Sequence, residues 1–390
     1  MILGHSIRLD PTEKQANKLA RAAGCARFAY NWGLGEWERL RAAGVKPKIG
    51  EIKKTFNALK RESFPWIYES PKDANQQAFA DLGQAFTNFF RWARECKGPR
   101  VGHPTKRKKG QGDSFYVSND KFRIDRLSVT LPVIGIVRMH ESLRLVGKIV
   151  GARVCLKAGR WSIAVQVEGD HRRPTTPSRV IAGIDLGLKT AIVISRSEIG
   201  TPEPVDSPRP LRAALRSLRR ANRRMHRREK GSRNRHKARL HVARIHERVA
   251  NIRKDFMHKI TTRLCRENQA VCIEDLNVKG MMANHCLARA ISDVGFGMFR
   301  QFVTYKGPIY GCEVIIADRF FPSSKRCSRC GHVKEVLSLS ERTYTCDVCA
   351  TVKDRDENAA LNLESYPRLA GNGRKATPTD DSSSTLRAVS

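Results

Sequence analysis

The chain has 390 residues, of which 40% are hydrophobic, so it is long enough for two or three domains with packed cores. Its 73 Lys and Arg outnumber its 38 Asp and Glu, which gives a formal net charge of +35. Such a charge repels itself in a compact fold, and contact with the phosphates of RNA or DNA is the usual compensation. An anionic membrane would attract the same charge. However, no apolar run is long enough to span a bilayer and no signal peptide is evident, so we expect a soluble intracellular protein without a membrane partner.

The N-terminal half combines helical and strand-like segments. Residues 1 to 10 alternate like a strand, and residues 11 to 13 begin a helical stretch. A later helical stretch carries an apolar stripe, which predicts burial of Phe79, Leu82, Phe86, Phe89 and Phe90. Residues 97 to 112 are rich in Gly, Pro and Lys and indicate a basic loop, for which solvated surface is the ordinary explanation. The short strand-like segments after it, one with a Lys-Ala-Gly-Arg turn, predict a small β-barrel or sheet.

A main domain boundary is expected at residues 171 to 179, whose HRRPTTPSR sequence has linker composition and precedes the apolar strand VIAGID. A helical pair follows between residues 206 and 262, interrupted at Gly231 and Ser232, with one apolar stripe along it that includes Val249 and Ile252 and is expected to pack on a partner. Residues 211 to 248 contain fifteen Lys or Arg but only two Glu. These are too few acids for the ion pairs of a merely solvated helix, so contact with phosphate is favoured. The tail from residue 369 lacks apolar periodicity and is expected to be disordered.

Three acidic residues follow apolar segments or begin a helix. Asp185 ends the strand VIAGID and precedes a Gly that permits a tight turn, so a simple turn is the ordinary explanation for this Asp alone. Glu274 follows the apolar run in QAVCIEDLNV, where an unpaired carboxylate is costly. Asp275 is the less favoured ligand of that pair. The segment DRDENAALNLES indicates a helix start, for which N-capping is the alternative explanation.

Capping needs only one acid, so we assign Asp354 to support and leave Asp356 free to bind a metal. Together with Asp185 and Glu274, it gives a set of three carboxylates on separate segments. Such a set can hold two Mg²⁺ ions roughly 4 Å apart for the hydrolysis of a phosphodiester. Mg²⁺ prefers hard oxygen ligands and keeps several waters, which suits so sparse a set. The sequence has neither a G-x-S-x-G nucleophile motif nor a phosphate-binding P-loop.

Eleven Cys divide into seven scattered ones, which we interpret as buried thiols, and two tight pairs. The pairs Cys327/Cys330 and Cys346/Cys349 give the spacing C-x₂-C-x₁₅-C-x₂-C of a four-Cys zinc ribbon. An all-Cys site has no open position, so one structural Zn²⁺ is predicted. Disulfides are the lesser alternative in a reducing compartment. Lys325 lies beside the first pair and is a candidate contact for nucleic acid.

Several motifs, in order, resemble the TnpB (OrfB) family: GIDLG, an Arg-rich arm ending in ARIHERVANIRKDFMHK, IEDLNVKGM, FFPSSKRCSRCG, YTCDVC and DRDENAALNL. These motifs cover residues 180 to 363, and the N-terminal half matches more loosely. The family's three catalytic acids fall on Asp185, Glu274 and Asp356, the residues already chosen from their positions. One departure is Ala350, where the family commonly has Gly.

The resemblance implies an α/β RNase H-like (RuvC) nuclease domain at residues 176–318 and 353–368, with the arginine-rich arm at 206–262. It implies a zinc ribbon that binds target nucleic acid at 319–352 and a disordered tail at 369–390. Residues 1–10 and 113–175 would form a wedge β-barrel, with a helical recognition lobe inserted at 11–112.

The resemblance also implies an RNA-guided DNA endonuclease, encoded by a transposable element of a prokaryote, that acts in the cytoplasm as a monomer or weak dimer. Its partners would be a guide RNA derived from the transposon end and a double-stranded target beside a short motif, cut by Mg²⁺-dependent double-strand breaks. Base pairing would carry the sequence specificity. The nucleic-acid contacts expected from the basic segments and the resemblance are Lys72, Gln76, Lys106, Arg107, Lys108, Arg223, Arg224, Arg227, Arg228 and Lys325.

Two alternatives remain open from the sequence. A guide-dependent or guide-free DNA-binding repressor fits the charge and the zinc ribbon equally well, and the complete set of acids argues against it. An RNase H-like transposase also uses three acids, but it needs recognition of the element ends and strand transfer.

Overall fold

The computed structural model describes residues 1–96, 100–173, 180–196, 200–338 and 340–370. The expected tail therefore lies outside the described residues from residue 371 onward. Residues 97–99 of the basic loop and residues 174–179 of the expected linker also lie outside them. The chain divides into two compact units, Met1–His171 and a second that begins at Arg172. Each unit is described by itself below. No described helix combines the length and the apolar composition that crossing a membrane requires.

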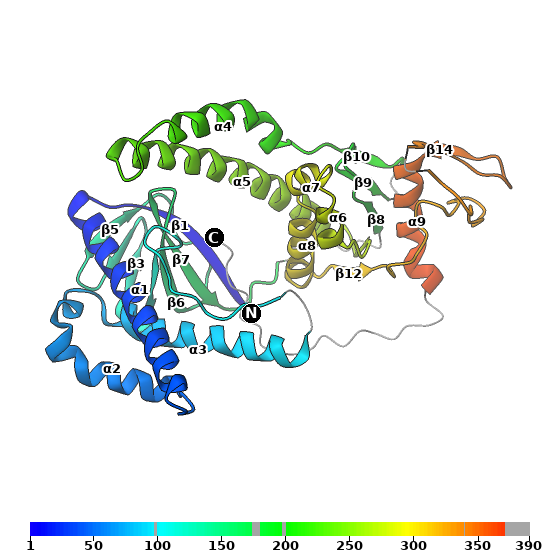
Figure 1. Ribbon diagram of the computed structural model, residues 1–390. Coiled ribbons are helices and arrows are strands. Elements are labelled where there is room, and N and C mark those ends of the chain that lie inside the picture. The colour runs from blue at the N-terminus through cyan, green and yellow to red at the C-terminus, as the bar shows by residue number, and fades with distance from the viewer. Residues whose placement is uncertain (97–99, 174–179, 197–199, 339, 371–390) are drawn as a thin grey trace. The chain divides into compact units, whose positions relative to one another are not determined.

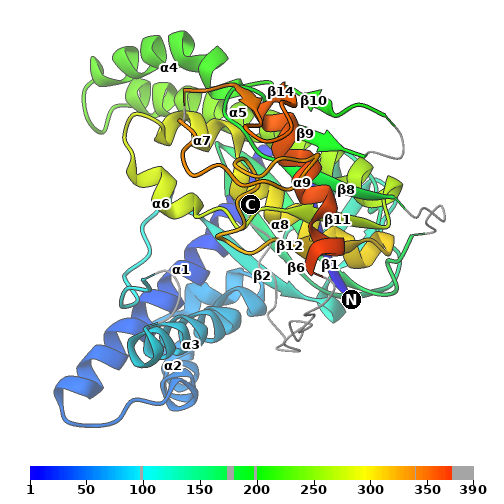
Figure 2. The ribbon, with the colours of Figure 1, turned by 90° about the vertical axis from the view of Figure 1, so that its right-hand side faces the viewer.

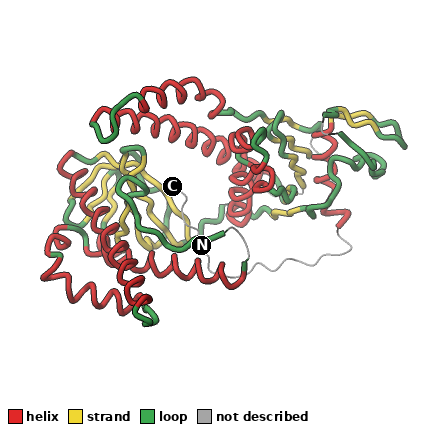
Figure 3. The backbone as a smooth tube through the Cα atoms, viewed as in Figure 1, coloured by secondary structure: helices red, strands yellow, loops and turns green. Residues whose placement is uncertain are grey.

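The first unit contains a seven-stranded antiparallel sheet in the order β2-β6-β7-β1-β5-β4-β3. Figure 3 distinguishes its strands, in yellow, from the helices, in red. Apolar side chains alternate along the strands, so one face forms a core that includes Ile7, Val137 and Ile163. The strands are β1 (Ile2–Asp10), β2 (Ser114–Ser118), β3 (Arg123–Asp125), β4 (Ser128–Leu131), β5 (Gly135–Met139), β6 (Lys148–Lys157) and β7 (Arg160–Glu168). The predicted Lys-Ala-Gly-Arg turn is confirmed, because β6 and β7 form a hairpin around it.

Three helices of the first unit share a second core. They are α1 (Glu13–Ala42), α2 (Ile49–Ser63) and α3 (Lys72–Glu95), with short 3₁₀ turns at Pro65–Glu69 and Asn119–Lys121. Thr12 and Gln15 form a capping box that starts α1 at the predicted point. The predicted stripe on α3 is buried at Phe79, Leu82 and Phe86. The prediction was wrong for Phe90, which is 46% exposed, because it lies near the end of α3, beyond the part that this core covers.

The second unit is built on a five-stranded sheet in the order β10-β9-β8-β11-β12, in which β8, β11 and β12 pair in parallel and β9 pairs antiparallel with both β8 and β10. Its strands are β8 (Ile181–Asp185), β9 (Ile192–Ser195), β10 (Glu203–Val205), β11 (Ala270–Ile273) and β12 (Glu313–Ile316). One face packs on a core with residues of α5 (Arg233–Glu267) and α8 (Phe296–Tyr310). The other face packs on α9 (Arg355–Leu369). Figures 1 and 2 show α9 against β8.

The predicted helical pair is confirmed as α4 (Pro210–His226) and α5. The side chain of Ser232 caps α5 at the predicted interruption. Leu218 of α4 and Val242 of α5 are buried between the two helices. The stripe was wrong at Ile252, which is 39% exposed, because no core cluster of the unit includes it.

Short elements complete the second unit. They are α6 (Val278–Ala283), α7 (Ala288–Val294), β13 (Thr343–Thr345) and β14 (Val352–Asp354), and the last two form a hairpin. The expectation of buried single cysteines was wrong for two of them. Cys96 is exposed at the C-cap of α3, and Cys286 is exposed between α6 and α7, where no core element covers it.

Candidate functional site

Strand register brings two of the predicted acids together at one edge of the sheet. In the parallel pair, Ile184 of β8 lies opposite Ile273 of β11, so Asp185 and Glu274 follow at the same level. Side chains alternate between the faces of a sheet. Because Ile184 and Ile273 point to the core with α5 and α8, Asp185 and Glu274 belong to the face covered by α9. The predicted strand end and turn at Asp185 are also confirmed, since β8 ends there and pairs antiparallel with the next strand, β9.

Helix α9 carries the third acid and packs closely on β8 at Gly183. A Cβ atom at Gly183 would lie 2.1 Å from the carbonyl oxygen of Ala360 and 2.2 Å from the amide nitrogen of Glu364. The buried side chain of Glu364 also accepts a hydrogen bond of 2.5 Å from Ser195 of β9. With α9 fixed in this way, its first turn reaches the end of β8. A Cβ atom at Gly187 would lie 3.5 Å from the Asp356 Oδ2 atom.

The roles predicted for the two aspartates at the start of α9 are partly visible in the contacts. The Asp354 side chain accepts hydrogen bonds from the backbone N–H of Asp356, at 2.8 Å, and of Glu357, at 3.3 Å. Asp354 is therefore the N-cap of α9, as predicted. Asp356 takes no part in the cap, and its carboxylate meets the side chain of Arg355, with Nε and Oδ1 3.4 Å apart.

The electrostatics at Asp185 favour binding of a cation. Asp185 is 7% exposed, and among the described residues none donates a hydrogen bond or forms an ion pair to its carboxylate. Burial raises the pKa of Asp185 well above its usual value, and the nearby carboxylates of Glu274 and Asp356 raise it further. Burial also raises the pKa of Glu274, and the Asp356 carboxylate adds to this effect. Arg355 lowers the pKa of Asp185 but does not offset these effects, and a bound divalent ion would relieve the remaining repulsion between the acids.

The neighbouring Asp275 is satisfied by two arginines. Its carboxylate pairs with Arg300 of α8 and with Arg319, whose Nη2 lies 2.6 Å from Oδ2. The hydrogen bond from Arg300 lowers the pKa of Asp275, and Arg319 lowers it further. Asp275 is thus a structural anchor here, in keeping with its lower rank as a ligand. Ser323, which donates a hydrogen bond to the Glu274 carboxylate, was missed. Its only sequence signal was its place in the FFPSSK motif.

The four predicted zinc ligands are brought together. The Sγ atoms of Cys327, Cys330, Cys346 and Cys349 lie within 4.8 Å of one another. The Cys327–Cys349 and Cys330–Cys346 Sγ pairs are 3.6 Å and 3.5 Å apart. These distances exceed a disulfide bond, about 2.05 Å, and approach the roughly 3.8 Å separation of thiolates around tetrahedral zinc. In the described part of the chain no second group of His, Cys, Asp or Glu ligands is gathered so closely, so the three carboxylates are not drawn together around a single ion.

Both cysteine pairs lie on matching backbone turns. The N–H of Gly331 donates to the carbonyl of Cys327 at 2.9 Å, and the N–H of Ala350 donates to the carbonyl of Cys346 at 3.1 Å. Gly331 has φ +80° and Ala350 has φ +53°. Ala350, which stands where the family commonly has Gly, therefore carries a Cβ in a backbone conformation that favours glycine.

The first zinc turn is linked to α9 and to the acids. Two asparagines of α9 that are 1% exposed donate to backbone carbonyls before and within this turn. Asn358 donates to the carbonyl of Arg326 at 2.7 Å, and Asn362 donates to those of Ser323 at 2.8 Å and Arg326 at 2.6 Å. Because Ser323 also bonds Glu274, the zinc turn, the helix of Asp356 and the strand of Glu274 form one connected unit. These asparagines were not singled out from the sequence.

Some predicted nucleic-acid contacts are occupied by the protein itself. Arg107 pairs with Asp81 at 3.2 Å, and its guanidinium lies 3.8 Å from the ring centroid of Tyr30. Lys325 Nζ donates to the carbonyl of Glu335 at 2.7 Å, and Gln76 donates to Asn57 at 2.8 Å. By contrast, Lys72, Lys106 and Lys108 have exposed side chains.

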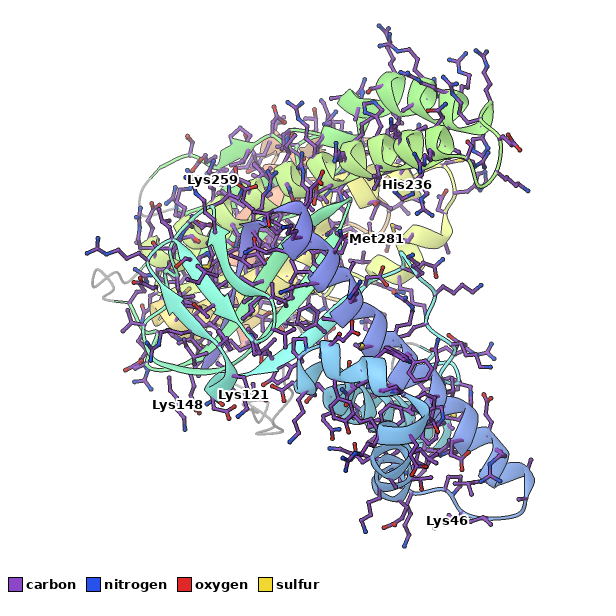
Figure 4. All side chains as sticks on the ribbon, turned by 90° about the vertical axis from the view of Figure 1, so that its left-hand side faces the viewer. Lys46, Lys121, Lys148, His236, Lys259 and Met281 are labelled. Atoms are coloured by element: carbon purple, nitrogen blue, oxygen red, sulfur yellow. The ribbon has the colours of Figure 1, made fainter. Side chains whose placement is uncertain are left out.

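The predicted arm presents a dense basic surface. Arg223, Arg224, Arg227 and Arg228 are exposed, and together with Arg220 they line a shallow groove. Figure 4 shows nitrogen-tipped side chains extending from α4 and α5, where His236 and Lys259 are labelled. The start of α4 is fixed by Asp293 of α7, which accepts from the N–H of Leu211 at 2.9 Å and of Arg212 at 3.0 Å. The arm is thus held at its base and positively charged along its length.

Comparison with known families and structures places the fold. Three family models match: a probable transposase family (OrfB, IS605) at residues 162–285, a Cas12f1-like TNB domain at 296–363, and a helix-turn-helix domain at 1–46. In this chain the last range forms β1 and the single helix α1. A solved Cas12f1–sgRNA–target DNA complex matches with a TM-score of 0.54 at 14% identity, over 90% of this chain and 83% of that one. The fold is therefore that of the Cas12 effectors.

Two curated relatives are similar over most of their length. A putative RNA-guided DNA endonuclease of Streptomyces pristinaespiralis is 36% identical over 370 residues, which span 91% of this chain and 87% of the relative. The putative RNA-guided DNA endonuclease InsQ of Escherichia coli K12 is 29% identical over 374 residues, or 91% and 90% of the two chains. The chain belongs to the TnpB (OrfB) family, which confirms the resemblance of its ordered motifs.

Proposed function

We propose that the protein is an RNA-guided DNA endonuclease whose active site consists of Asp185, Glu274 and Asp356. The observation that carries this proposal is the placing of three acids from the ends of β8 and β11 and the start of α9 on one face of a sheet, where burial, Glu274 and Asp356 raise the pKa of Asp185 despite the opposing effect of Arg355. The names of the relatives support the RNA-guided activity. The order of the five strands, in which β9 runs opposite to β8, β10, β11 and β12, supports an RNase H-like nuclease domain at residues 176–318 and 353–368.

The donor set suits Mg²⁺, because all three ligands are carboxylates and two of them have raised pKa values that a cation would lower again. When bound, two Mg²⁺ ions would supply an activated water and stabilisation of the leaving oxygen. The chain's own residues orient this site. Ser323 holds the Glu274 carboxylate by a hydrogen bond, and Asp354 caps α9 so that the Asp356 carboxylate takes no part in the cap.

The remaining parts fit a protein that holds RNA and DNA together. The exposed arginines of the arm match the phosphates of a guide RNA, and the four thiols match one structural Zn²⁺ in a ribbon at residues 319–352. We assign residues 1–10 and 113–175 to a wedge and 11–112 to a recognition lobe, where Lys72 and Gln76 would face a short duplex motif beside the target. The result of the reaction would be a double-strand break next to that motif.

The test is to express the protein with its native flanking DNA, sequence the RNA that co-purifies, and challenge the complex with targets that have randomised flanks. We expect one specific RNA, cleavage that requires Mg²⁺, and enrichment of one flanking motif. Asp185→Ala and Glu274→Ala should abolish cleavage, whereas Asp255→Ala should not, because Asp255 is an exposed acid that pairs with Lys259 on the surface of α5. Target binding without any cleavage by the wild type would favour a repressor, and joining of the element ends would favour a transposase.

A further inference from the structure

Phe320 has the highest exposed fraction, 87%, among the large hydrophobic side chains that the structure describes. It lies on the turn that leads from the end of β12 to the first zinc ligand, Cys327. Single exposed hydrophobic residues are common on proteins, so exposure alone assigns no role to this ring. The construction of the turn and its place beside the acids set Phe320 apart.

The backbone of this turn is fixed by hydrogen bonds. The N–H of Phe320 donates to Asp318 Oδ1 at 2.8 Å, and the N–H of Phe321 donates to the carbonyl of Asp318 at 3.0 Å. The N–H of Asp318 donates in turn to the Tyr366 hydroxyl of α9 at 3.1 Å. The next ring, Phe321, packs on Tyr366 with centroids 4.8 Å apart. The chain therefore packs one phenyl ring, half-buried, against α9 and holds its neighbour in solvent on an ordered turn.

Both sides of Phe320 are attached to the site of the acids. Arg319, the residue before it, pairs with Asp275 at 2.6 Å. Ser323, three residues after it, donates a hydrogen bond to Glu274. Three residues of extended chain span about 10 Å at most between their Cα atoms, so Phe320 is tethered close to the serine that contacts this carboxylate.

The charges around the ring favour a nucleic-acid strand over an apolar protein surface. Arg300 and Arg319, which both pair with Asp275, are 42% and 55% exposed at their side chains, so two guanidinium groups beside this turn remain accessible to phosphate. Exposed aromatic rings next to basic residues are how proteins hold single strands, because an unpaired base stacks on the ring and the phosphates meet the cations. Bases within a duplex have their faces already covered.

We propose that Phe320 is a positioning residue whose ring stacks on one unpaired base of the DNA strand that enters the site of Asp185, Glu274 and Asp356. This inference rests on the proposed nuclease function and deepens it, since it assigns the single-stranded form of the substrate to this site. The stacked base fixes the register of the strand, and therefore which phosphodiester bond reaches the acids.

The test compares Phe320→Ala, Phe320→Leu and Phe320→Trp in the guide-loaded complex. Under single turnover with saturating Mg²⁺, Phe320→Ala and Phe320→Leu should cleave more slowly by about five- to 150-fold, the range for loss of one stacked base. Their cut positions should also spread over neighbouring bonds. Phe320→Trp should retain the rate and the cut position. Val336→Ala, at an 82% exposed hydrophobic position of the same ribbon, is the matched control and should match the wild type.

A second readout does not depend on cleavage. In the Asp185→Ala background, a single-stranded DNA with 2-aminopurine near the cut position should lose fluorescence on binding, and adding Phe320→Ala should restore it. Wild-type rate and cut position in Phe320→Ala would overturn the proposal, as would full rescue by Phe320→Leu, which keeps an apolar contact but cannot stack. Absence of cleavage in the wild type would instead refute the proposed function, and the fluorescence result would still decide whether Phe320 stacks.

Discussion

At Asp185, burial and two neighbouring carboxylates act in the same direction on one side chain. We predict that Asp185→Asn makes the metal-free protein more stable at neutral pH, because the amide keeps the shape and removes the repulsion. Melting in EDTA should rise by roughly 2–4 °C for each kcal/mol of repulsion removed. Mg²⁺ should stabilise the wild type more than the variant. Asp255→Asn, at an exposed acid, should change neither result.

The same residue gives a pH dependence with a defined sign. Because the pKa of Asp185 is raised in the folded chain, the folded chain binds this proton more tightly than the unfolded chain does. The stability of the metal-free wild type should therefore fall as the pH rises from the ordinary carboxyl range through the raised pKa. Urea unfolding at several pH values in EDTA should show a steeper fall for the wild type than for Asp185→Asn. Parallel curves would contradict the electrostatic explanation.

Ala350 has a backbone conformation that costs an L-residue about 1 kcal/mol. Ala350→Gly should remove this strain and stabilise the zinc-bound ribbon by up to about 1 kcal/mol, reduced by the greater freedom of glycine in the unfolded chain. Competition with a chromophoric chelator would show tighter zinc retention. Gly331→Ala in the matching turn should have the opposite effect, since it places a Cβ on a residue with φ +80° and so introduces the same kind of backbone strain. Equal zinc retention in both variants would contradict the strain.

For single residues, the sequence predicted those site residues whose type is unusual in their sequence context, such as an acid that ends an apolar run. Asp185 and Glu274 were visible because each ends an apolar run, and the zinc ligands because their spacing is characteristic. Ser323 and Asn362 could not be predicted in the same way. A serine or an asparagine in a polar loop or on a helix has no distinctive pattern, and its partner is decided only by the docking of α9 on the sheet.

Between elements, the contact of α9 with β8 decides whether the third acid reaches the other two. We predict that Gly183→Ala abolishes cleavage and destabilises the protein, since its Cβ would overlap backbone atoms of α9 at 2.1 Å and 2.2 Å. Backbone on both sides leaves no flexible side chain to move, so the cost should reach several kcal/mol. Gly297→Ala in α8, where nothing lies within 4 Å of the new Cβ, should keep activity and stability. Chemical denaturation and cleavage assays would check both variants.

The starts of helices could be predicted from local capping residues. The extent of burial along a helix could not be predicted from its sequence alone. Thr12, Ser232 and Asp354 are capping side chains that mark helix starts, and all three function as N-caps in the structure. Periodicity predicted a buried stripe but not its extent. Phe90 and Ile252 continue the helical spacing where no partner element covers them, because the length of a helix and the reach of its core are set by different contacts.

For the molecule as a whole, the net charge of +35 predicts a polyanionic partner. The location of the basic residues allows this prediction to be tested. Four exposed arginines of the arm lie at one groove, and none of them pairs with a carboxylate among the described residues: Arg223, Arg224, Arg227 and Arg228. If each neutralises one phosphate, their joint change to Gln should weaken binding of the co-purified RNA. It should also reduce the slope of log K against log salt by up to about 3 to 4.

Filter binding of that RNA between about 50 and 200 mM salt would measure the slope, because counterion release is strong over this range. Lys259→Gln is the control on the same arm, since Lys259 already pairs with Asp255 at 2.8 Å and should leave the slope nearly unchanged. A weaker affinity with an unaltered slope in the fourfold variant would mean that the arginines act through the fold of the arm. If the fourfold variant had the affinity and the slope of the wild type, the RNA would bind elsewhere than on these arginines of the arm. The excess charge elsewhere in the chain would then have to account for binding.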